Sequence, residues 1–278
     1  MITLEMVFLV WLGALIAGLL GALTGLGGGV VIVPLLVLVF GVDIRYAMGA
    51  SLVSVIATSC GAAAVYVREG FSNIRIGMFL EMATAAGAVL GASLTFSLPT
   101  DIIGIIFGIV LLISAGLAVQ GKVEPPGGEK PDRLGSRLRM DSSYPTPEGP
   151  RSYRVSRVPG GFGVMFGAGT VSGLLGIGSG PFKVLAMDQV MRIPFKVSTT
   201  TSNFMIGVTA ATSAGFYLRQ GYVAPGLAMP VVLGTLLGAA AGTHLLVKSR
   251  PKWLRLVFSL VIAVMGVEMI YGALTGKL

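Results

Sequence analysis

Two glycine-rich stretches could bind an anion through their backbone. Gly25-Leu26-Gly27-Gly28-Gly29 is followed 151 residues later by Gly176-Ile177-Gly178-Ser179-Gly180. Glycine is unfavourable inside a helix, so each stretch predicts a break and then a new helix. The free N–H groups and the dipole at a helix start attract negative charge. The substrate-binding candidates here are Gly25, Gly27, Gly28, Gly29, Gly176, Gly178, Ser179 and Gly180. The alternative is that these glycines only permit tight helix packing.

Lys183 is a further substrate-binding candidate. It lies two positions after Pro181 in apolar sequence, and the position 151 residues earlier is Ile32. An ionised side chain inside a membrane is costly, which makes it a functional candidate. A cation here would add charge to the second glycine stretch only. The alternatives are pairing with Asp188 and extension of the side chain to the membrane surface.

Hydroxyl and amide side chains begin the segments that follow the glycines. Such groups can coordinate the oxygens of an oxyanion, although hydrogen bonding between helices explains any one of them equally well. The candidates are Ser51, Ser54, Thr200, Ser202 and Asn203. Arg68 and Arg219 occupy matching positions at segment ends. They are candidates for a gate or anion funnel, with anchoring at the membrane interface as the alternative.

No enzyme or metal site is predicted. The sequence has no Ser/His/Asp arrangement, no His-Glu-x-x-His and no nucleotide-binding fingerprint. Cys60 and His244 are the single residues of their types, so neither a thiolate cluster nor a His-rich site is available and no cofactor is expected. Four titratable residues in apolar segments could carry a coupling proton, and the sequence does not choose among them. They are Glu81, Asp188, His244 and Glu268.

The composition predicts how these residues are positioned. Of 278 residues, 54% are hydrophobic and 12% are charged, which is typical of a polytopic protein in a lipid bilayer. The net charge of +8 lies between apolar segments. Positive loops facing the cytoplasm therefore explain it better than nucleic-acid binding.

The chain is internally duplicated at the same spacing as the glycine stretches. Tyr66-x-Arg68-x-Gly70 matches Tyr217-x-Arg219-x-Gly221, again 151 residues apart. We therefore predict an all-α polytopic membrane protein with two repeats. Each repeat has a glycine-broken helix hairpin followed by three transmembrane helices. The expected divisions are a first repeat at 1–120, a flexible linker at 121–159, rich in proline and charge, and a second repeat at 160–278.

The first apolar segment, Leu4–Phe40, is too long for one crossing. As one helix it would measure roughly 55 Å, against a hydrocarbon core of about 30 Å, so it forms either a re-entrant hairpin or two short crossings. An odd number of crossings per repeat leaves 16 Lys and Arg residues on one side and 3 on the other, against 12 and 7 for an even number. The positive-inside rule favours the odd number. This predicts inverted repeats in the inner membrane, a cytoplasmic linker and both termini outside.

The paired glycine stretches, Pro34 and the duplicated layout resemble the TauE/SafE-type anion permeases, often called sulfite exporters. The resemblance covers nearly the whole chain apart from the linker. It implies a secondary transporter that exports a small sulfur-containing anion, such as sulfite or an organosulfonate like sulfoacetate, by alternating access. An anion channel and a carrier of another small oxyanion are the alternatives.

Overall fold

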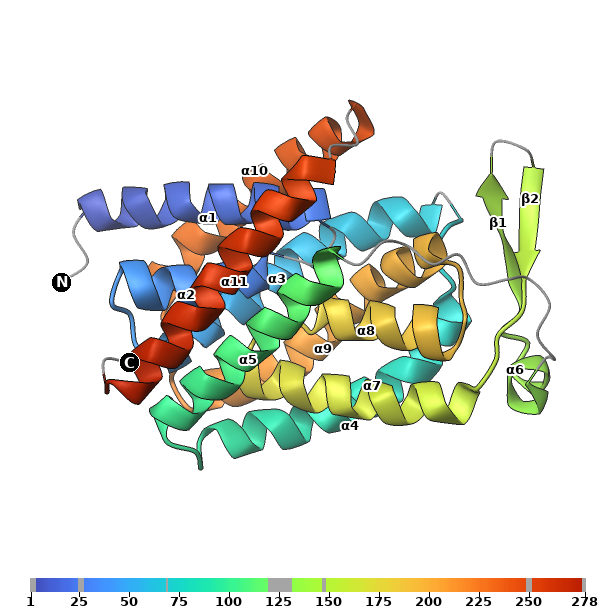
Figure 1. The fold of residues 1–278 in the computed structure, drawn as a ribbon, viewed down its shortest axis with the longest axis horizontal. Coiled ribbons are helices and arrows are strands. Elements are labelled where there is room, and N and C mark those ends of the chain that lie inside the picture. The colour runs from blue at the N-terminus through green and yellow to red at the C-terminus, as the bar shows by residue number, and fades with distance from the viewer. Residues whose placement is uncertain are drawn as a thin grey trace.

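The computed structural model describes residues 4–24, 28–68, 70–119, 132–146, 149–248 and 252–276, and it is mostly helical (Figure 1). Eight long helices carry the architecture of this part of the chain. They are α1 (Leu4–Thr24), α3 (Ile44–Arg68), α4 (Ile74–Thr95), α5 (Thr100–Val119), α7 (Val158–Leu175), α9 (Phe195–Arg219), α10 (Pro225–Lys248) and α11 (Lys252–Leu274). Among the described residues, α1, α4, α5 and α7 are long and apolar enough to cross a membrane. The other helices include α3 and α9, whose sequences contain several Ser and Thr residues.

Two short helical segments follow the glycine stretches. Helix α2 (Gly29–Pro34) continues directly into a π-helical segment, η1 (Leu35–Val39). Helix α8 (Gly180–Leu185) continues in the same way into η2 (Ala186–Val190). We call residues 29–39 the first half-helix and residues 180–190 the second half-helix. At about 1.5 Å per residue each is roughly 16 Å long, half the thickness of a bilayer core.

Each half-helix folds back along the helix that precedes it. A Cβ added at Gly28 would lie 3.6 Å from Gly18 Cα, and a Cβ added at Gly13 would lie 3.0 Å from Leu35 Cδ2. Gly28 thus lies beside Gly18, and the later residue Leu35 lies beside the earlier residue Gly13. This order of contacts defines an antiparallel hairpin. In the second half, Gly160 lies beside Val190 at the far end of η2. The geometry is therefore that of a re-entrant hairpin, with the half-helix returning toward the end where the preceding helix begins.

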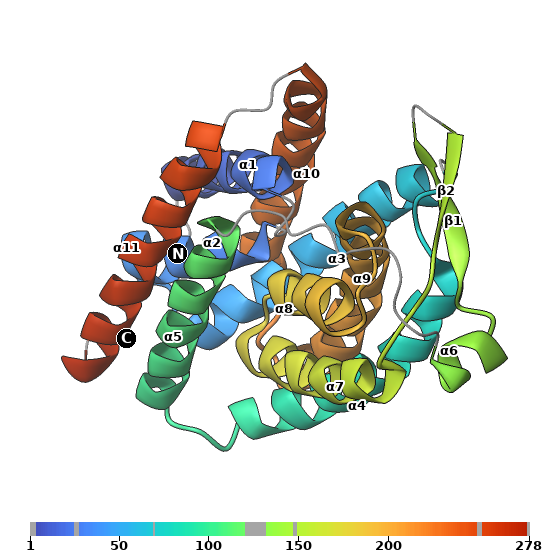
Figure 2. The same cartoon turned by 45° about the vertical axis from the view of Figure 1, so that its right-hand side comes forward.

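Each long helix packs against a helix of the other half, and a shift of 151 residues relates the pairs to one another. Helix α1 packs against α10 and α7 packs against α4, while α3 crosses α9 and α5 lies along α11 (Figure 2). The closest contacts between these helices are related by the same shift. A Cβ at Gly18 would collide with the Thr235 carbonyl, and a Cβ at Gly169 would collide with the Thr84 carbonyl. The two halves therefore pack on each other through equivalent surfaces.

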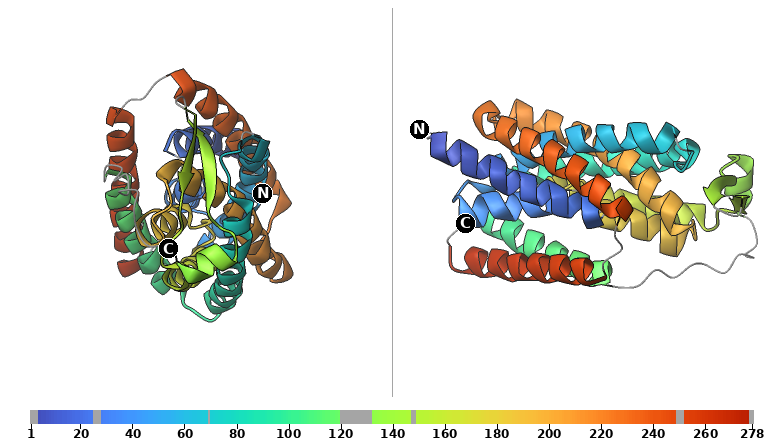
Figure 3. Two further views of the ribbon diagram at one scale, coloured as in Figure 1. Left: turned by 90° about the vertical axis from the view of Figure 1, so that its right-hand side faces the viewer. Right: turned by 90° about the horizontal axis from the view of Figure 1, so that it is seen from above.

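The two ends of the molecule are also built alike. The Arg45 guanidinium lies 5.7 Å from the ring centre of Tyr222 at one end, and the Lys196 ammonium lies 3.8 Å from that of Phe71 at the other. These two pairs are again related by 151 residues. Both ends of the described chain lie near one end of the long axis, and the strands β1 and β2 lie at the opposite end (Figures 1 and 3).

The segment between the halves differs from the flexible linker that its composition predicts. Residues 121–131, 147 and 148 lie outside the described part, but the described residues form α6 (Arg133–Arg137) and two antiparallel strands, β1 (Ser142–Thr146) and β2 (Gly149–Tyr153). We call residues 132–156 the insert. The strands of the insert also depart from the purely α-helical fold that the sequence predicts. Composition alone does not reveal the few contacts that order the insert.

Those contacts attach the insert to the start of α4. The Asn73 side chain donates to the Met140 carbonyl at 2.9 Å and to the Tyr153 hydroxyl at 2.8 Å, while its oxygen accepts from Ile76 N. Met140 and Val155 are buried in a cluster with residues of α4, α7, η2 and α9. Burial also raises the pKa of Tyr153 above its usual value. The Asn73 amide and a small apolar core thus contribute to anchoring the insert.

The α4–α7 crossing should tolerate no added carbon at its contact point. A Cβ at Gly169 would overlap the Thr84 carbonyl, whereas Gly167, two residues earlier, has open space. We expect Gly169→Ala to lower the free energy of unfolding by about 1–3 kcal/mol through overpacking, and the matched control Gly167→Ala to cause no loss. Thermal unfolding of both purified variants in detergent measures this. Equal stability of the two would contradict the close approach of these helices.

Candidate functional site

The two glycine breaks lie together at the crossing of α3 and α9. A Cβ at Gly29 would lie 2.7 Å from Val55 Cγ2 and 3.5 Å from the Ile177 carbonyl oxygen. A Cβ at Gly178 would lie 3.2 Å from Val55 Cγ1 and 2.9 Å from Ile206 Cγ2. Val55 therefore touches both breaks, and Ile206 is its equivalent on α9. The half-helices begin side by side, although they are far apart in sequence.

One serine hydroxyl contacts the start of each half-helix. Ser51 Oγ lies 3.5 Å from the Gly29 carbonyl oxygen, and Ser202 Oγ lies 3.5 Å from the Gly180 carbonyl oxygen. Both serines are buried. These two contacts are related by the 151-residue spacing, so the hydroxyls predicted to face the breaks are next to them in both halves. The first N–H groups of each half-helix have no carbonyl partner within their own helix.

Ser179 is the least expected residue of the second break. It has a left-handed backbone with φ +46°, whereas its equivalent Gly28 has φ −66°. Its side chain is fully buried, and within the described part of the chain its Oγ has no hydrogen-bond partner. A buried hydroxyl without a partner is unfavourable by about 1–3 kcal/mol. An unfilled hydrogen-bonding position therefore lies directly at the start of the second half-helix.

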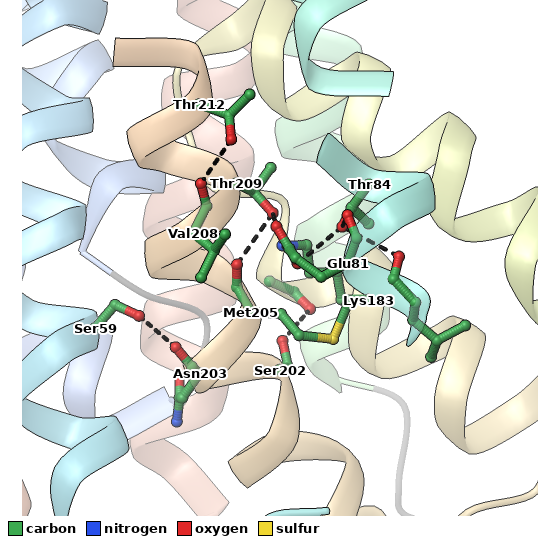
Figure 4. A network of polar contacts seen from close by, with 12 residues as sticks. Ser59, Glu81, Thr84, Lys183, Ser202, Asn203, Met205, Val208, Thr209 and Thr212 are labelled. Atoms are coloured by element: carbon green, nitrogen blue, oxygen red, sulfur yellow. Dashed lines mark hydrogen bonds and ion pairs between the residues drawn. The ribbon is translucent and has the colours of Figure 1, made fainter. Parts of the chain in front are cut away.

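Lys183 is fully buried and belongs to a polar network between α4, α8 and α9 (Figure 4). Its Nζ donates to Thr209 Oγ1 at 2.5 Å and lies 3.8 Å from Glu81 Oε2. Thr209 donates to Glu81 Oε1 at 2.6 Å, and Thr84 donates to Glu81 Oε2 at 2.8 Å. The two threonines thus hold the carboxylate from either side, and one of them also connects it to the ammonium.

The partner of Lys183 is Glu81, not Asp188. Asp188 is partly exposed in η2, and its Oδ1 has no partner among the described residues. Glu81 was one of four titratable candidates in the sequence. No sequence pattern links it to a lysine that lies 102 residues further on, because the contact arises only when α4 packs against the second half.

Each half contributes one charge to this network, and neither charge has a charged equivalent in the other half. The positions equivalent to Lys183 and Glu81 are Ile32 and Val232. The two threonines, by contrast, have threonine equivalents in the other half, at positions 58 and 235. The halves therefore share the hydroxyl groups and differ in the ion pair.

The other predicted residues are more dispersed. Ser54 hydrogen-bonds to Thr235 at 2.8 Å, and Thr200 donates to the Phe71 carbonyl at 3.0 Å near the start of α9. The backbone carbonyl of Asn203 accepts from Ser59, and its side chain is partly exposed. These contacts join helices and do not face the breaks directly.

The remaining candidates are at the ends of helices or outside the described residues. Arg219 is exposed at the end of α9. Arg68 ends α3, but its side chain lies outside the described part of the structure, as do Gly25 and Gly27. In the described ranges, no three His, Cys, Asp or Glu side chains gather in a group that could hold a metal ion.

The fold and site are those of a polytopic membrane protein, and sequence comparison defines its family. The chain belongs to the family described as Sulfite exporter TauE/SafE, whose model matches residues 10–269. This is a family of membrane transporters, as the resemblance in the sequence implied. No solved structure matches the chain.

Three relatives match this chain over most of their length. The probable membrane transporter protein YunE of Bacillus subtilis is 29% identical over 276 residues, covering 96% of this chain and 98% of the relative. YdhB of the same organism, with the same description, is 27% identical and covers 85% and 87%. The probable membrane transporter protein MJ0441 of Methanocaldococcus jannaschii is 25% identical and covers 97% and 99%.

Breaking the ion pair should destabilise the protein more than replacing it. Lys183→Met leaves the buried Glu81 carboxylate without its cation, so we expect a loss on the order of 3–5 kcal/mol in the free energy of unfolding. The double change Lys183→Ile with Glu81→Val replaces each charged residue by the apolar residue found at its equivalent position and should recover most of this loss. Thermal unfolding in detergent measures both.

Asp188 provides the matched control. Adding Asp188→Asn to Lys183→Met should recover nothing, because the structure pairs Lys183 with Glu81. Recovery by the Asp188 change, with none from the Glu81 change, would contradict the assignment.

Proposed function

We propose that the chain is a secondary transporter that exports a small sulfur-containing anion, such as sulfite or an organosulfonate, by alternating access. The observation that carries this is the juxtaposition of the two half-helix starts at Val55, with the unpartnered Ser179 hydroxyl beside them. Helix starts aimed at one buried point attract an anion through their N–H groups and dipoles. Membership of a sulfite exporter family supports the substrate class.

The proposed substrate site uses both halves. Its donors are the first backbone N–H groups of the half-helices and the hydroxyls of Ser51, Ser179 and Ser202. Lys183 adds the one positive charge that belongs to the described half-helices. Because Val55 and Ile206 close the space between the breaks, substrate entry requires these side chains to separate, as expected for a carrier that opens to one side at a time.

The proposed topology is two inverted repeats in the inner membrane, with the insert cytoplasmic and both termini outside. Two observations support it. The chain ends and the insert lie at opposite ends of the molecule (Figure 3). The insert also carries exposed arginines, in agreement with the positive-inside rule. They are Arg133, Arg137, Arg139, Arg151 and Arg154.

The orientation can be tested with two cysteines at opposite ends. In a Cys60→Ser background, Ser143→Cys marks the insert and Gln220→Cys marks the turn after α9; both positions are exposed. In intact cells, a membrane-impermeant thiol reagent should label position 220 and not position 143. Permeabilised cells should allow labelling at both. The opposite pattern in intact cells would overturn the orientation.

The function is tested by flux into liposomes with sulfite, sulfoacetate, thiosulfate and sulfate. We expect saturable uptake of at least one anion and counter-transport by preloaded substrate, which an open channel would not give. Gly29→Ala should lower the flux about tenfold or more, because its Cβ would lie 2.7 Å from Val55 and 2.9 Å from Ser51 Oγ. Gly61→Ala on α3 has open space and is the matched control. Transport of a cation or neutral solute, with none of these anions moved, would refute the proposal.

A further inference from the structure

We propose that Glu81 is a proton-binding site that takes up one proton when an anion binds beside Lys183. This inference rests on the proposed anion site and adds a second ligand, the proton, to it. It selects one carboxylate from the titratable groups of the apolar segments. In the described chain Glu268 is exposed on α11 and Asp188 is partly exposed in η2, whereas Glu81 is buried against the lysine.

The first step is the position of the ammonium. Lys183 belongs to the first turn of α8, and its side chain extends to Thr209 on α9. Thr209 comes three residues after Ile206, the residue against which Gly178 packs, so both side chains are on one face of α9. The ammonium is therefore about one helical turn from the second break. An anion seated at that break would come close to it.

The second step is how the carboxylate is held. The 3.8 Å between Lys183 Nζ and Glu81 Oε2 exceeds the roughly 2.7–2.9 Å of a direct charge-assisted hydrogen bond. The short contacts of the carboxylate are those with Thr84 and Thr209. An ammonium has three donor hydrogens, and among the described residues Lys183 makes one hydrogen bond, to Thr209. Glu81 thus neutralises the lysine without using all of its donors, and a second anion can be accommodated.

The third step is the charge balance. Without substrate, Lys183⁺ and Glu81⁻ sum to zero in a buried site. A bound monoanion brings the sum to −1, which a low-dielectric environment disfavours strongly. Uptake of one proton from water converts the Glu81 carboxylate to a carboxylic acid and restores zero. The protonated carboxyl can still accept hydrogen bonds from the two threonines through its remaining lone pairs.

No other described charged group can supply this balance. Glu81 is on α4, which packs against α7 and α9. Helix α7 contains no titratable residue. On α9, Lys196 contacts Phe71 near the first turn, Arg219 is exposed at the last residue, and Tyr217 hydrogen-bonds to Thr95. On α4 itself, Arg75 donates to the Arg139 carbonyl of the insert. From α8, Lys183 alone faces the carboxylate.

The test is calorimetric titration of the purified protein with methanesulfonate, a monoanion whose charge is constant between about pH 6 and pH 9. Where Glu81 is ionised in the free protein, linkage predicts that affinity rises about tenfold for each unit of falling pH. In buffers of different ionisation enthalpy, the heat should report one proton taken up per anion. Glu81→Gln mimics the protonated form, so its affinity should be independent of pH and match the low-pH value of the wild type.

Infrared difference spectra of the wild type give a test that needs no folded Glu81→Gln protein. Anion addition should produce the carbonyl band of a protonated carboxylic acid. The double variant Lys183→Ile with Glu81→Val, which carries the apolar residues of the equivalent positions, should lack both this band and the pH dependence.

The outcomes separate the two proposals. Wild-type binding that is independent of pH and takes up no proton would overturn the role of Glu81 and leave the anion transporter intact. A pH dependence that persists in Glu81→Gln would likewise move the proton elsewhere and overturn the assignment. Absence of binding by any anion at any pH would remove the proposed function and this inference together.

Discussion

The structure depends on the requirement that backbone N–H and C=O groups away from water be paired or covered by protein. The two half-helices are each roughly 16 Å long, so they begin in the interior, where their first N–H groups have no partner in their own helix. Ser51 and Ser202 lie beside them, and Val55 and Ile206 pack against the breaks. This requirement explains why α3 and α9, which cross beside the breaks, are richer in hydroxyls than the outer apolar helices.

The same requirement explains why glycines are found at the helix crossings. Helices α1 and α7 can deliver the breaks to the centre only if they pack closely on α10 and α4. At both contacts a Cβ on the glycine would overlap a threonine carbonyl, at Gly18 with Thr235 and at Gly169 with Thr84. Close packing thus places the two threonines in the interior. Thr84 then contributes its hydroxyl to Glu81, which connects helix packing to the polar network.

Much of the fold could be predicted from the sequence. Glycine breaks a helix at its own position, and the 151-residue spacing identifies the equivalent positions of the two halves. The breaks, the long helices that follow them and the serines at positions 51 and 202 all lie where the repeated pattern indicates. The structure of the insert could not be predicted. It depends on contacts of Asn73, Met140 and Val155, which are distant in sequence and form no recognisable motif. The pairing of Lys183 with Glu81 could not be predicted for the same reason, and the only pairing partner that the sequence suggested was the nearer Asp188.

The difference between the halves bears on why a buried ion pair is present at all. Buried ion pairs add little net stability, because desolvation of both charges offsets their attraction. The equivalent positions hold Ile32 in the first half and Val232 in the second half, so the shared architecture also accepts apolar residues there. The threonines at 58, 84, 209 and 235 are common to both halves and therefore belong to helix packing, where each hydroxyl lies within hydrogen-bonding distance of a carbonyl of its own helix. Packing alone thus accounts for the hydroxyls and leaves the charges unexplained. A single cation and a single carboxylate lie beside one of two similar breaks. A transporter needs such a pair if each cycle carries one anion and binds and releases one proton.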